Sequence, residues 1–238
     1  MRSEFDKYAA SYEGLLRDPI RDRFVVDAEF FHKRKWDLLS SFFHKARFDT
    51  AIAAWLDVGC GKGALLQFGR PAFKEVAGCD PSAEMLRSEC EGIQVVMQSD
   101  PLTIPFPDER FDVLTAVCVY HHVQPSARAA LTNEAVRVLK PGGWFVVIEH
   151  NPWNPATRWI VRRTPVDAEA RLLTATQSRE LLAAAGLRVL NTRYFLYFPE
   201  RLYARVGRLE SLLAHVPAGG QYAVFATKSP AVPDAGLE

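Results

Sequence analysis

The sequence predicts a doubly wound α/β fold, in which a mostly parallel β-sheet carries helices on both of its faces. Short apolar segments alternate with helical patterns along most of the chain. A glycine-rich turn at residues 59–63 directly follows the first of these apolar segments. Residues 111–119 form a nearly continuous apolar run, as expected for a parallel strand that is buried on both faces.

Seven segments have the character of strands, namely residues 53–57, 75–79, 93–97, 111–119, 144–148, 187–198 and 222–228. Helices are predicted between them. One opens at Pro81, and another starts near Pro125 and ends at the turn 140–143. A helix over residues 174–185 begins with a capping box of Thr174 and Gln177. The last two strands flank a further helix and are expected to pair antiparallel at the edge of the sheet.

The chain divides into three parts. Residues 1–50 contain aromatic residues at helical spacing and are expected to form an N-terminal helical lid. Residues 51–228 are expected to form a Rossmann-like domain, with insertions near 150–173 and 199–218 that line the substrate pocket. The proline-containing tail 229–238 is expected to be disordered.

Composition excludes several function classes. The 238 residues carry a formal net charge of +1, so no global charge favours nucleic acid or an anionic membrane as partner. No apolar stretch is long enough to span a bilayer, and the acidic N-terminus lacks a signal peptide pattern, which predicts a cytoplasmic protein. The cysteines contain no CxxC pair, and no metal is expected.

Acidic residues end four of the predicted strands, at Asp57, Asp80, Asp100 and Glu149. In an open α/β sheet, ligands bind outside the carboxyl ends of the strands. The glycine turn lets a ligand approach backbone amides, and an acid at the end of the second strand is placed to accept ribose hydroxyls. These features predict an adenosine-containing cofactor. The spacing Gly59–Ala64 also fits the dinucleotide fingerprint, so a nicotinamide cofactor stays open at this point.

The string Leu56-Asp57-Val58-Gly59-Cys60-Gly61-Lys62-Gly63 resembles the first motif of the class I S-adenosylmethionine-dependent methyltransferases. Residues 78–86 are similar to the second motif, and Asp100 with residues 104–114 is similar to the third and fourth. Residues 134–143 resemble the helix and turn before strand five, and Phe5 to Tyr12 resemble the lid helix of small-molecule members. The resemblance implies S-adenosylmethionine as the methyl donor, S-adenosylhomocysteine as the product and a small-molecule acceptor.

The resemblance also implies which residues contact the cofactor, and these are Asp57, Gly59, Gly61, Asp80, Pro81, Asp100, Leu102, Val117, Cys118 and Tyr12. Asp57 and the glycine backbone are expected at the methionine part, where a carboxylate suits an ammonium and would repel a pyrophosphate. Asp80 is expected to hold the ribose hydroxyls. Asp100 is expected at the adenine amino group, with Pro81 and Leu102 near the ring.

His121 and His122 follow the fourth strand, beside the expected position of the transferred methyl group. Either histidine is a candidate general base for an acceptor that must lose a proton. The other interpretation is a structural histidine that bonds the backbone at a strand end. Trp153 and the prolines beside it are expected to form a rigid wall of the acceptor pocket.

Two alternatives to a small-molecule methyltransferase follow from the same residues. One is an NAD(P)-dependent oxidoreductase on the same fold, which Asp57 and the later motifs disfavour. The other is a non-catalytic member that binds the cofactor without turnover. The sequence does not identify the acceptor, the methylated atom or the oligomeric state.

Overall fold

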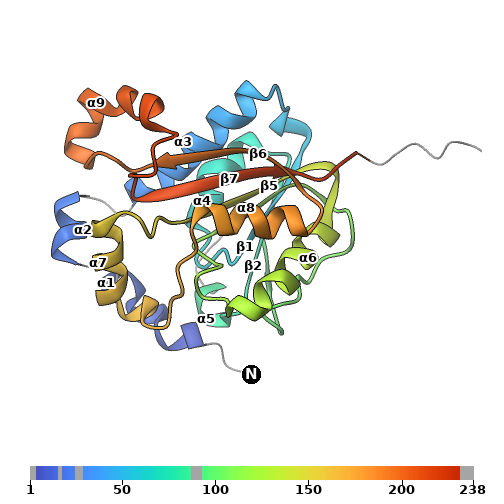
Figure 1. Cartoon of the computed structure of the whole chain (residues 1–238). Coiled ribbons are helices and arrows are strands. Elements are labelled where there is room, and N and C mark those ends of the chain that lie inside the picture. The colour runs from blue at the N-terminus through green and yellow to red at the C-terminus, as the bar shows by residue number, and fades with distance from the viewer. Residues whose placement is uncertain (1–3, 16–17, 25–28, 87–92, 231–238) are drawn as a thin grey trace, which may run out of the picture.

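The computed structural model describes residues 4–15, 18–24, 29–86 and 93–230. Its centre is one seven-stranded sheet with the order β3-β2-β1-β4-β5-β7-β6 (Figure 1). The strands are β1 (Ala54–Val58), β2 (Glu75–Asp80), β3 (Gln94–Met97), β4 (Phe111–Val117), β5 (Leu139–His150), β6 (Arg188–Phe195) and β7 (Gln221–Thr227). Strands β1 to β5 pair parallel, whereas β7 runs antiparallel to both β5 and β6. The predicted mixed sheet with its antiparallel edge is confirmed.

The helices that connect and cover the strands agree with most of the predicted positions. The α-helices are α1 (Tyr12–Leu15), α2 (Pro19–Phe24), α3 (Glu29–Lys45), α4 (Ala64–Gly69), α5 (Ala83–Leu86), α6 (Arg128–Val138), α7 (Pro155–Arg163), α8 (Ala175–Ala184) and α9 (Glu200–Leu213). The 3-10 helices are η1 (Glu4–Lys7), η2 (Ala9–Ser11), η3 (Thr50–Ile52), η4 (Arg70–Ala72), η5 (Pro125–Ala127) and η6 (Pro165–Asp167). The predicted capping box of Thr174 and Gln177 opens α8 as expected.

Each face of the sheet carries its own apolar core, because successive side chains of a strand point to opposite faces. Trp55 of β1 packs with Leu39 of α3 and Leu66 of α4 on one face. The next residue, Leu56, belongs to the other core, with Leu131 of α6. Helix α8 covers this second face at β6 and β7 (Figure 1). This arrangement leaves the carboxyl ends of the parallel strands at one edge.

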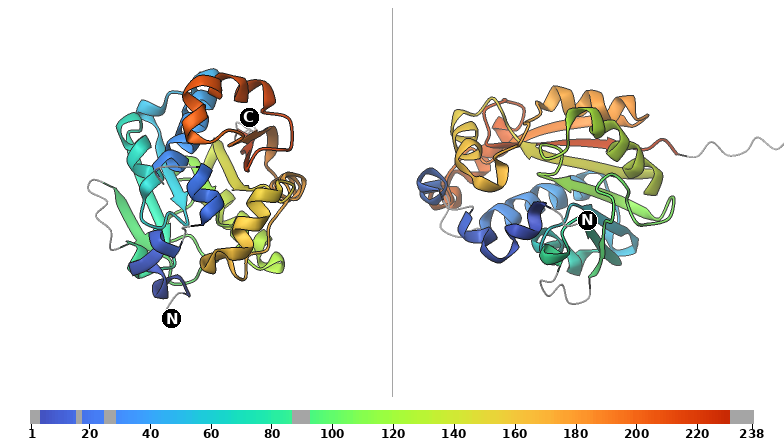
Figure 2. Two further views of the ribbon diagram at one scale, coloured as in Figure 1. Left: turned by 90° about the vertical axis from the view of Figure 1, so that its left-hand side faces the viewer. Right: turned by 90° about the horizontal axis from the view of Figure 1, so that it is seen from below.

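The N-terminal helices, α7 and α9 gather on one side of the molecule (Figure 2, left). The Asp6 carboxylate of η1 accepts a 2.7 Å hydrogen bond from the hydroxyl of Ser82, next to the end of β2. Buried Asp18, just before α2, forms an ion pair with Arg163 of α7. The helical character of the N-terminal segment is confirmed, while its function as a lid stays a prediction. Most of the predicted disordered tail, residues 231–238, lies outside the described residues.

Strand β5 begins at Leu139, five residues before the predicted start at Trp144. Leu139 pairs with Phe111, and the register then shifts before Trp144 pairs with Val113. The predicted turn at 140–143 is therefore an irregular first part of the strand. The backbone of this part is hydrogen-bonded to the residue that follows β7, since the Gly142 amide donates to the Lys228 carbonyl over 2.9 Å.

Residues 150–173 contain a helix, α7, that the sequence analysis does not predict. Asn154 caps α7 by accepting a 2.9 Å hydrogen bond from the Thr157 amide, and Pro155 is its first residue. This Asn-Pro pair is a known start signal for helices and was present in the sequence. Within the described ranges, no helix combines the length and apolar character that a membrane span requires.

Candidate functional site

The glycine turn follows β1 and is held against the end of β2. The amides of Gly59 and Cys60 both donate to the Cys79 carbonyl, over 2.7 and 3.0 Å. Gly59 and Gly61 have φ angles of 69° and 52°, the left-handed region that favours glycine. A Cβ at Gly59 would lie 2.5 Å from the side chain of Val119, whereas a Cβ at Gly61 would meet open space. Gly61 thus faces a space that a ligand can enter.

Asp57, in the fourth position of β1, is almost fully buried below this turn. Its carboxylate accepts a 2.5 Å hydrogen bond from the hydroxyl of Thr115, which in turn accepts one from the Trp55 indole. Burial raises the pKa of Asp57 to about 7, and the Thr115 hydrogen bond acts in the opposite direction. A buried carboxylate with this pKa gains charge readily when a cation comes close.

Asp80, the last residue of β2, links the turn to the start of the next helix. Its carboxylate accepts hydrogen bonds from the amides of Gly61 and Ser82, over 2.9 and 2.8 Å. Burial raises the pKa of Asp80, while these two amides favour the charged form. Gly61 and Asp80, which the sequence predicts as contacts, are thus bonded directly, and Gly59 and Asp57 lie in the same turn and at the end of the strand before it.

The predicted adenine contacts lie on the loops that follow β2 and β3. Asp100 is exposed, and its carboxylate accepts hydrogen bonds from the Leu102 amide and the Thr103 hydroxyl. These two donors lower the pKa of Asp100. Pro81 and Leu102 are both partly buried. Tyr12 is the first residue of α1, but its side chain lies outside the described part of the structure.

Val117 and Cys118 mark the end of β4, beside the glycine turn. Cys118 has a φ of 58°, unusual for a residue with a side chain, and its amide donates to the Ile148 carbonyl over 2.8 Å. Its sulfur lies 3.5 Å from the amide nitrogen of Gln221 on β7. The left-handed turn directs the chain from β4 into the loop that carries the two histidines.

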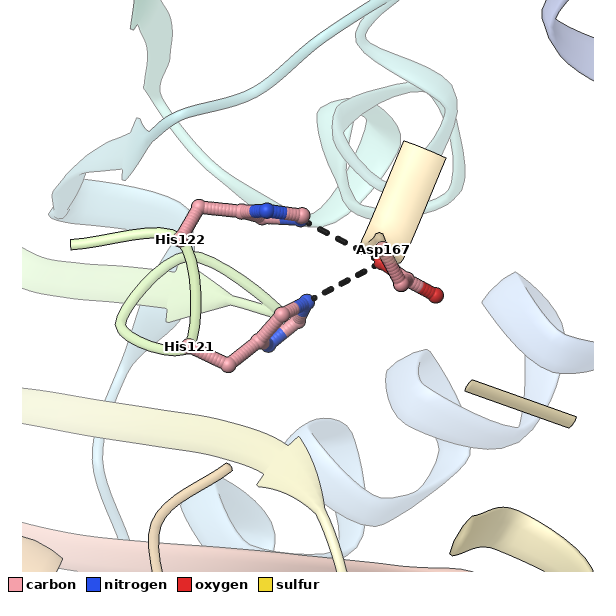
Figure 3. A group of neighbouring side chains, drawn as sticks. All are labelled: His121, His122 and Asp167. Carbon is pink, nitrogen blue, oxygen red and sulfur yellow. Dashed lines mark ion pairs between the residues drawn. The ribbon is translucent and has the colours of Figure 1, made fainter. Parts of the chain in front are cut away.

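His121 and His122 both point toward Asp167 of η6 (Figure 3). The Nε2 atom of each ring lies 3.5 Å from Asp167 Oδ1. On its other side, His121 Nδ1 forms a 2.6 Å hydrogen bond with Glu149 of β5. His121 is 1% exposed and Glu149 is fully buried. The ring of His150 lies next to that of His121, at a centroid distance of 5.2 Å.

Burial and neighbouring charges favour a protonated His121 and neutral rings at His122 and His150. Burial disfavours the charged form of His121, but Glu149 and Asp167 outweigh it and raise its pKa well above the ordinary value. Burial, together with the charge of His121, lowers the pKa of His122 and of His150 to about 4. A protonated His121 cannot accept a proton, so of the two histidines predicted as bases only His122 is available.

Sequence reasoning missed Asp167 and Thr115 as parts of this site. Thr115 sits inside the apolar run of β4, and its pairing with Asp57 could be inferred only from the register of two strands. Asp167 lies in a segment without periodicity, 45 residues after His122 in the chain, so no local pattern indicates their contact. Glu149 was singled out as a strand-end acid, but its hydrogen bond to His121 was not predicted.

The fold is that of a Rossmann-like α/β domain, in which the carboxyl ends of β1 and β2 are the expected place for a nucleotide-type cofactor. Residues 56–147, which contain Asp57, Asp80 and Asp100, match the family described as a methyltransferase domain. This segment is similar to the methyltransferase domain of the class I S-adenosylmethionine-dependent enzymes, and the cofactor that the match indicates is S-adenosylmethionine.

Relatives of this chain act on different acceptors. It is 28% identical over 136 residues to the tRNA (carboxymethyluridine(34)-5-O)-methyltransferase of Arabidopsis thaliana, covering 57% of this chain and 32% of that protein. It is 35% identical over 105 residues to the demethylmenaquinone methyltransferase of Thermus thermophilus, covering 41% of this chain and 47% of that protein. The match thus spans less than half the length of these curated relatives.

Solved structures share the fold over nearly the whole chain. A Thermotoga maritima protein described as a SAM-dependent methyltransferase, possible histamine N-methyltransferase, superposes with a TM-score of 0.69 at 18% identity. The superposition covers 94% of this chain and 98% of that one. The likeness therefore includes the N-terminal helices and the strands β6 and β7 as well as the core of the domain.

Proposed function

We propose that this protein transfers a methyl group from S-adenosylmethionine to a small-molecule acceptor by in-line displacement. The observation that carries the proposal is the pairing of two acids with one glycine turn: Asp57 lies beneath the turn and Asp80 is bonded to the amide of Gly61. An acceptor atom attacks the methyl carbon, the carbon–sulfur bond breaks, and its electron pair stays on sulfur. The products are the methylated acceptor and S-adenosylhomocysteine.

The binding of the cofactor follows from the charges of the site. Asp57 would meet the cationic methionine part, together with Gly59 and Gly61, because a cation stabilises the ionised carboxylate. Asp80 has acceptor capacity left for the ribose hydroxyls beyond its two amide bonds. Val117 and Cys118 would border the methionine part from the end of β4.

The adenine part would lie on the loops after β2 and β3. Asp100 would accept from the amino group of the ring, and its hydrogen bonds to Leu102 and Thr103 already fix the direction of its carboxylate. Pro81 and Leu102 would pack on the ring. Tyr12 of the N-terminal lid completes the proposed contact set.

His122 is the proposed general base, with His121 as the residue that positions it. The rings of the two histidines lie 4.1 Å apart, and both face Asp167. His122 keeps some exposure, so an acceptor can reach it, whereas His121 is fully enclosed. Burial and the charge of His121 lower the pKa of His122 to about 4, so the ring is neutral near pH 7.

RNA is a second candidate acceptor class, favoured by one surface feature besides the tRNA-modifying relatives. A cavity of about 370 Å³ beside α7 is lined by Trp153, Arg158 and Arg162 among others. Trp153 is 69% exposed. An exposed indole and two guanidinium groups that line one cavity suit a stacked base and its phosphate. An anionic small molecule would use the same groups.

The oxidoreductase alternative has no support from the relatives, and Asp57 below the turn would repel a pyrophosphate. A non-catalytic member would bind the cofactor and show no turnover. A cytoplasmic location is part of the proposal and is supported by Cys79 and Cys118, which form no disulfide in the described part of the chain.

The test is transfer of a labelled methyl group from S-adenosylmethionine to cell extract divided into a metabolite fraction and a tRNA fraction. Label in the metabolite fraction alone supports the small-molecule proposal. Label in the tRNA fraction would favour RNA if Trp153→Ala reduces it and Trp36→Phe, a control at a partly buried position on α3, does not. Cofactor binding with no label in either fraction would contradict both and favour the non-catalytic alternative.

A further inference from the structure

Three side chains from two separate segments meet at the carboxyl end of the sheet with their ligand atoms directed at one point (Figure 3). We propose that His121, His122 and Asp167 bind a divalent first-row transition-metal ion such as Zn²⁺ or Fe²⁺. Each residue offers one ligand atom, and the three atoms lie within 4.8 Å of one another. The proposal does not rest on methyl transfer, and it competes with the assignment of His122 as a general base, because a ring nitrogen bound to a metal ion cannot accept a proton.

The distances fit coordination by a small ion. A tetrahedral ion with bonds of about 2.0–2.1 Å holds its ligand atoms about 3.4 Å apart. Asp167 Oδ1 lies 3.5 Å from the Nε2 atom of His121 and 3.5 Å from that of His122. The carboxylate is thus already at coordination spacing from both imidazoles.

The surroundings of His121 are those of a metal ligand. Metal-bound histidines usually donate their second ring N–H to a carboxylate, which fixes the tautomer and the direction of the ring. His121 Nδ1 has this contact with Glu149, over 2.6 Å. Nε2 is fully buried and makes no hydrogen bond to any residue that the structure describes. Such a buried ring nitrogen without a hydrogen bond, 3.5 Å from the Asp167 carboxylate, is the ligand position that an ion would fill.

The protein holds the two ligand segments together in advance. The Tyr120 amide donates to Glu149 over 2.7 Å, which fixes the start of the histidine loop. The Arg171 amide donates to the His121 carbonyl over 2.7 Å, which ties the segment after η6 to the same loop. Arg128 bonds the carbonyls of both Tyr120 and Arg171. An ion would therefore enter a formed site.

The donor set points to the class of ion. Two imidazoles and one carboxylate suit Zn²⁺, Fe²⁺, Co²⁺ and Ni²⁺, whereas Mg²⁺ and Ca²⁺ prefer oxygen ligands only. Three protein ligands leave at least one position open for water or for an oxygen or nitrogen atom of a substrate. The competing occupant is a proton, which would leave His121 as an imidazolium between Glu149 and Asp167.

The test uses the full-length protein, freed of any tag and stripped with a chelator. Co²⁺ is titrated by visible absorption, and Zn²⁺ affinity is measured by competition with a chromophoric chelator. We expect one equivalent of either ion. His122→Ala and Asp167→Asn should each weaken binding by more than about 100-fold, and Glu149→Gln by about 10–100-fold as the partner of a ligand.

The control variant is His150→Gln, which changes a neighbouring buried histidine outside the triad and should keep the native affinity. Thermal unfolding verifies that each variant is folded, and His122→Ala is the key variant because His122 is the least buried of the three ligands. Absence of binding by the folded native protein would overturn the proposal and leave the proton as the occupant. Binding that persists in both His122→Ala and Asp167→Asn would overturn it equally.

Discussion

The Asp80 carboxylate accepts a hydrogen bond from the Gly61 amide over 2.9 Å, so the acid at the end of β2 is bonded to the turn that follows β1. The two residues lie 19 positions apart in the chain. This bond fixes the turn and orients the carboxylate before any cofactor arrives. The proposed cofactor contacts at the ends of β1 and β2 are thus held together before binding, which reduces the conformational entropy that binding costs.

Asp80→Ala should weaken binding of S-adenosylhomocysteine by about 1–3 kcal/mol, because the ribose hydroxyls lose their acceptor and the turn loses its tie. Calorimetric titration measures this change. Asp49→Ala, at the N-cap of η3 before β1 and so at the opposite edge of the sheet, is the matched control. Native affinity in Asp80→Ala would contradict the proposed ribose contact.

Asp57 should make cofactor binding depend on pH. Burial raises its pKa from 3.8 to about 7, so the empty protein carries a neutral acid below this pH. A cationic ligand requires the ionised carboxylate, so cofactor affinity should rise with pH, by at most about tenfold per pH unit, and should level off above about pH 7. Titrations of S-adenosylhomocysteine between about pH 5 and pH 8 test this. Asp57→Asn should bind weakly at every pH, and a flat profile in the native protein would refute the assignment.

The same pKa predicts the pH dependence of stability. Since the folded pKa of Asp57 is raised, its contribution is fully present below 3.8 and is lost as pH rises to about 7. The native cofactor-free protein should therefore lose stability relative to Asp57→Asn across this window. Denaturant unfolding of both proteins at several pH values measures the difference. Parallel curves would show that Asp57 does not titrate in this range.

Gly59→Ala and Gly61→Ala form a matched pair that distinguishes an effect on stability from an effect on cofactor binding. Both place a side chain at positive φ, at a cost of about 1–2 kcal/mol. Only at Gly59 does the new Cβ also collide with Val119. We expect Gly59→Ala to lose more unfolding free energy, and Gly61→Ala to lose cofactor affinity beyond its loss of stability. Equal effects of the two variants on affinity and stability would contradict this.

His122→Ala should lower turnover on the true acceptor by about 10²–10⁴-fold while cofactor affinity changes little, the signature of a lost general base. Because the pKa of His122 is lowered to about 4, the acid limb of the rate profile should lie near that value rather than near 6.5. His121→Gln should also reduce turnover by releasing His122. Full turnover in both variants would remove the histidines from the mechanism.

The sheet and the cofactor turn could be predicted because their signals are local. Strand, glycine turn and acid lie within a few consecutive residues around Asp57, and the apolar run of β4 is continuous. The start of β5 could not be predicted from local signals, because the Gly142 amide donates its hydrogen bond to the carbonyl of Lys228, far away in the chain.

Tertiary pairing also decides which face of α9 is buried. Leu202 and Leu209 recur at helical spacing, yet they are 48% and 50% exposed. The buried residue of α9 is Glu210, which forms an ion pair with Arg34 of α3. The contact of His121 and His122 with Asp167 is likewise long-range. No periodic pattern in a single sequence encodes such contacts.

The most direct test of the cofactor assignment is a calorimetric titration of the native protein with S-adenosylmethionine, S-adenosylhomocysteine and NAD in parallel. The account predicts that both adenosyl ligands bind at one site and compete with each other, that Asp80→Ala weakens both, and that NAD does not bind. Binding of NAD in the absence of S-adenosylmethionine binding would contradict it.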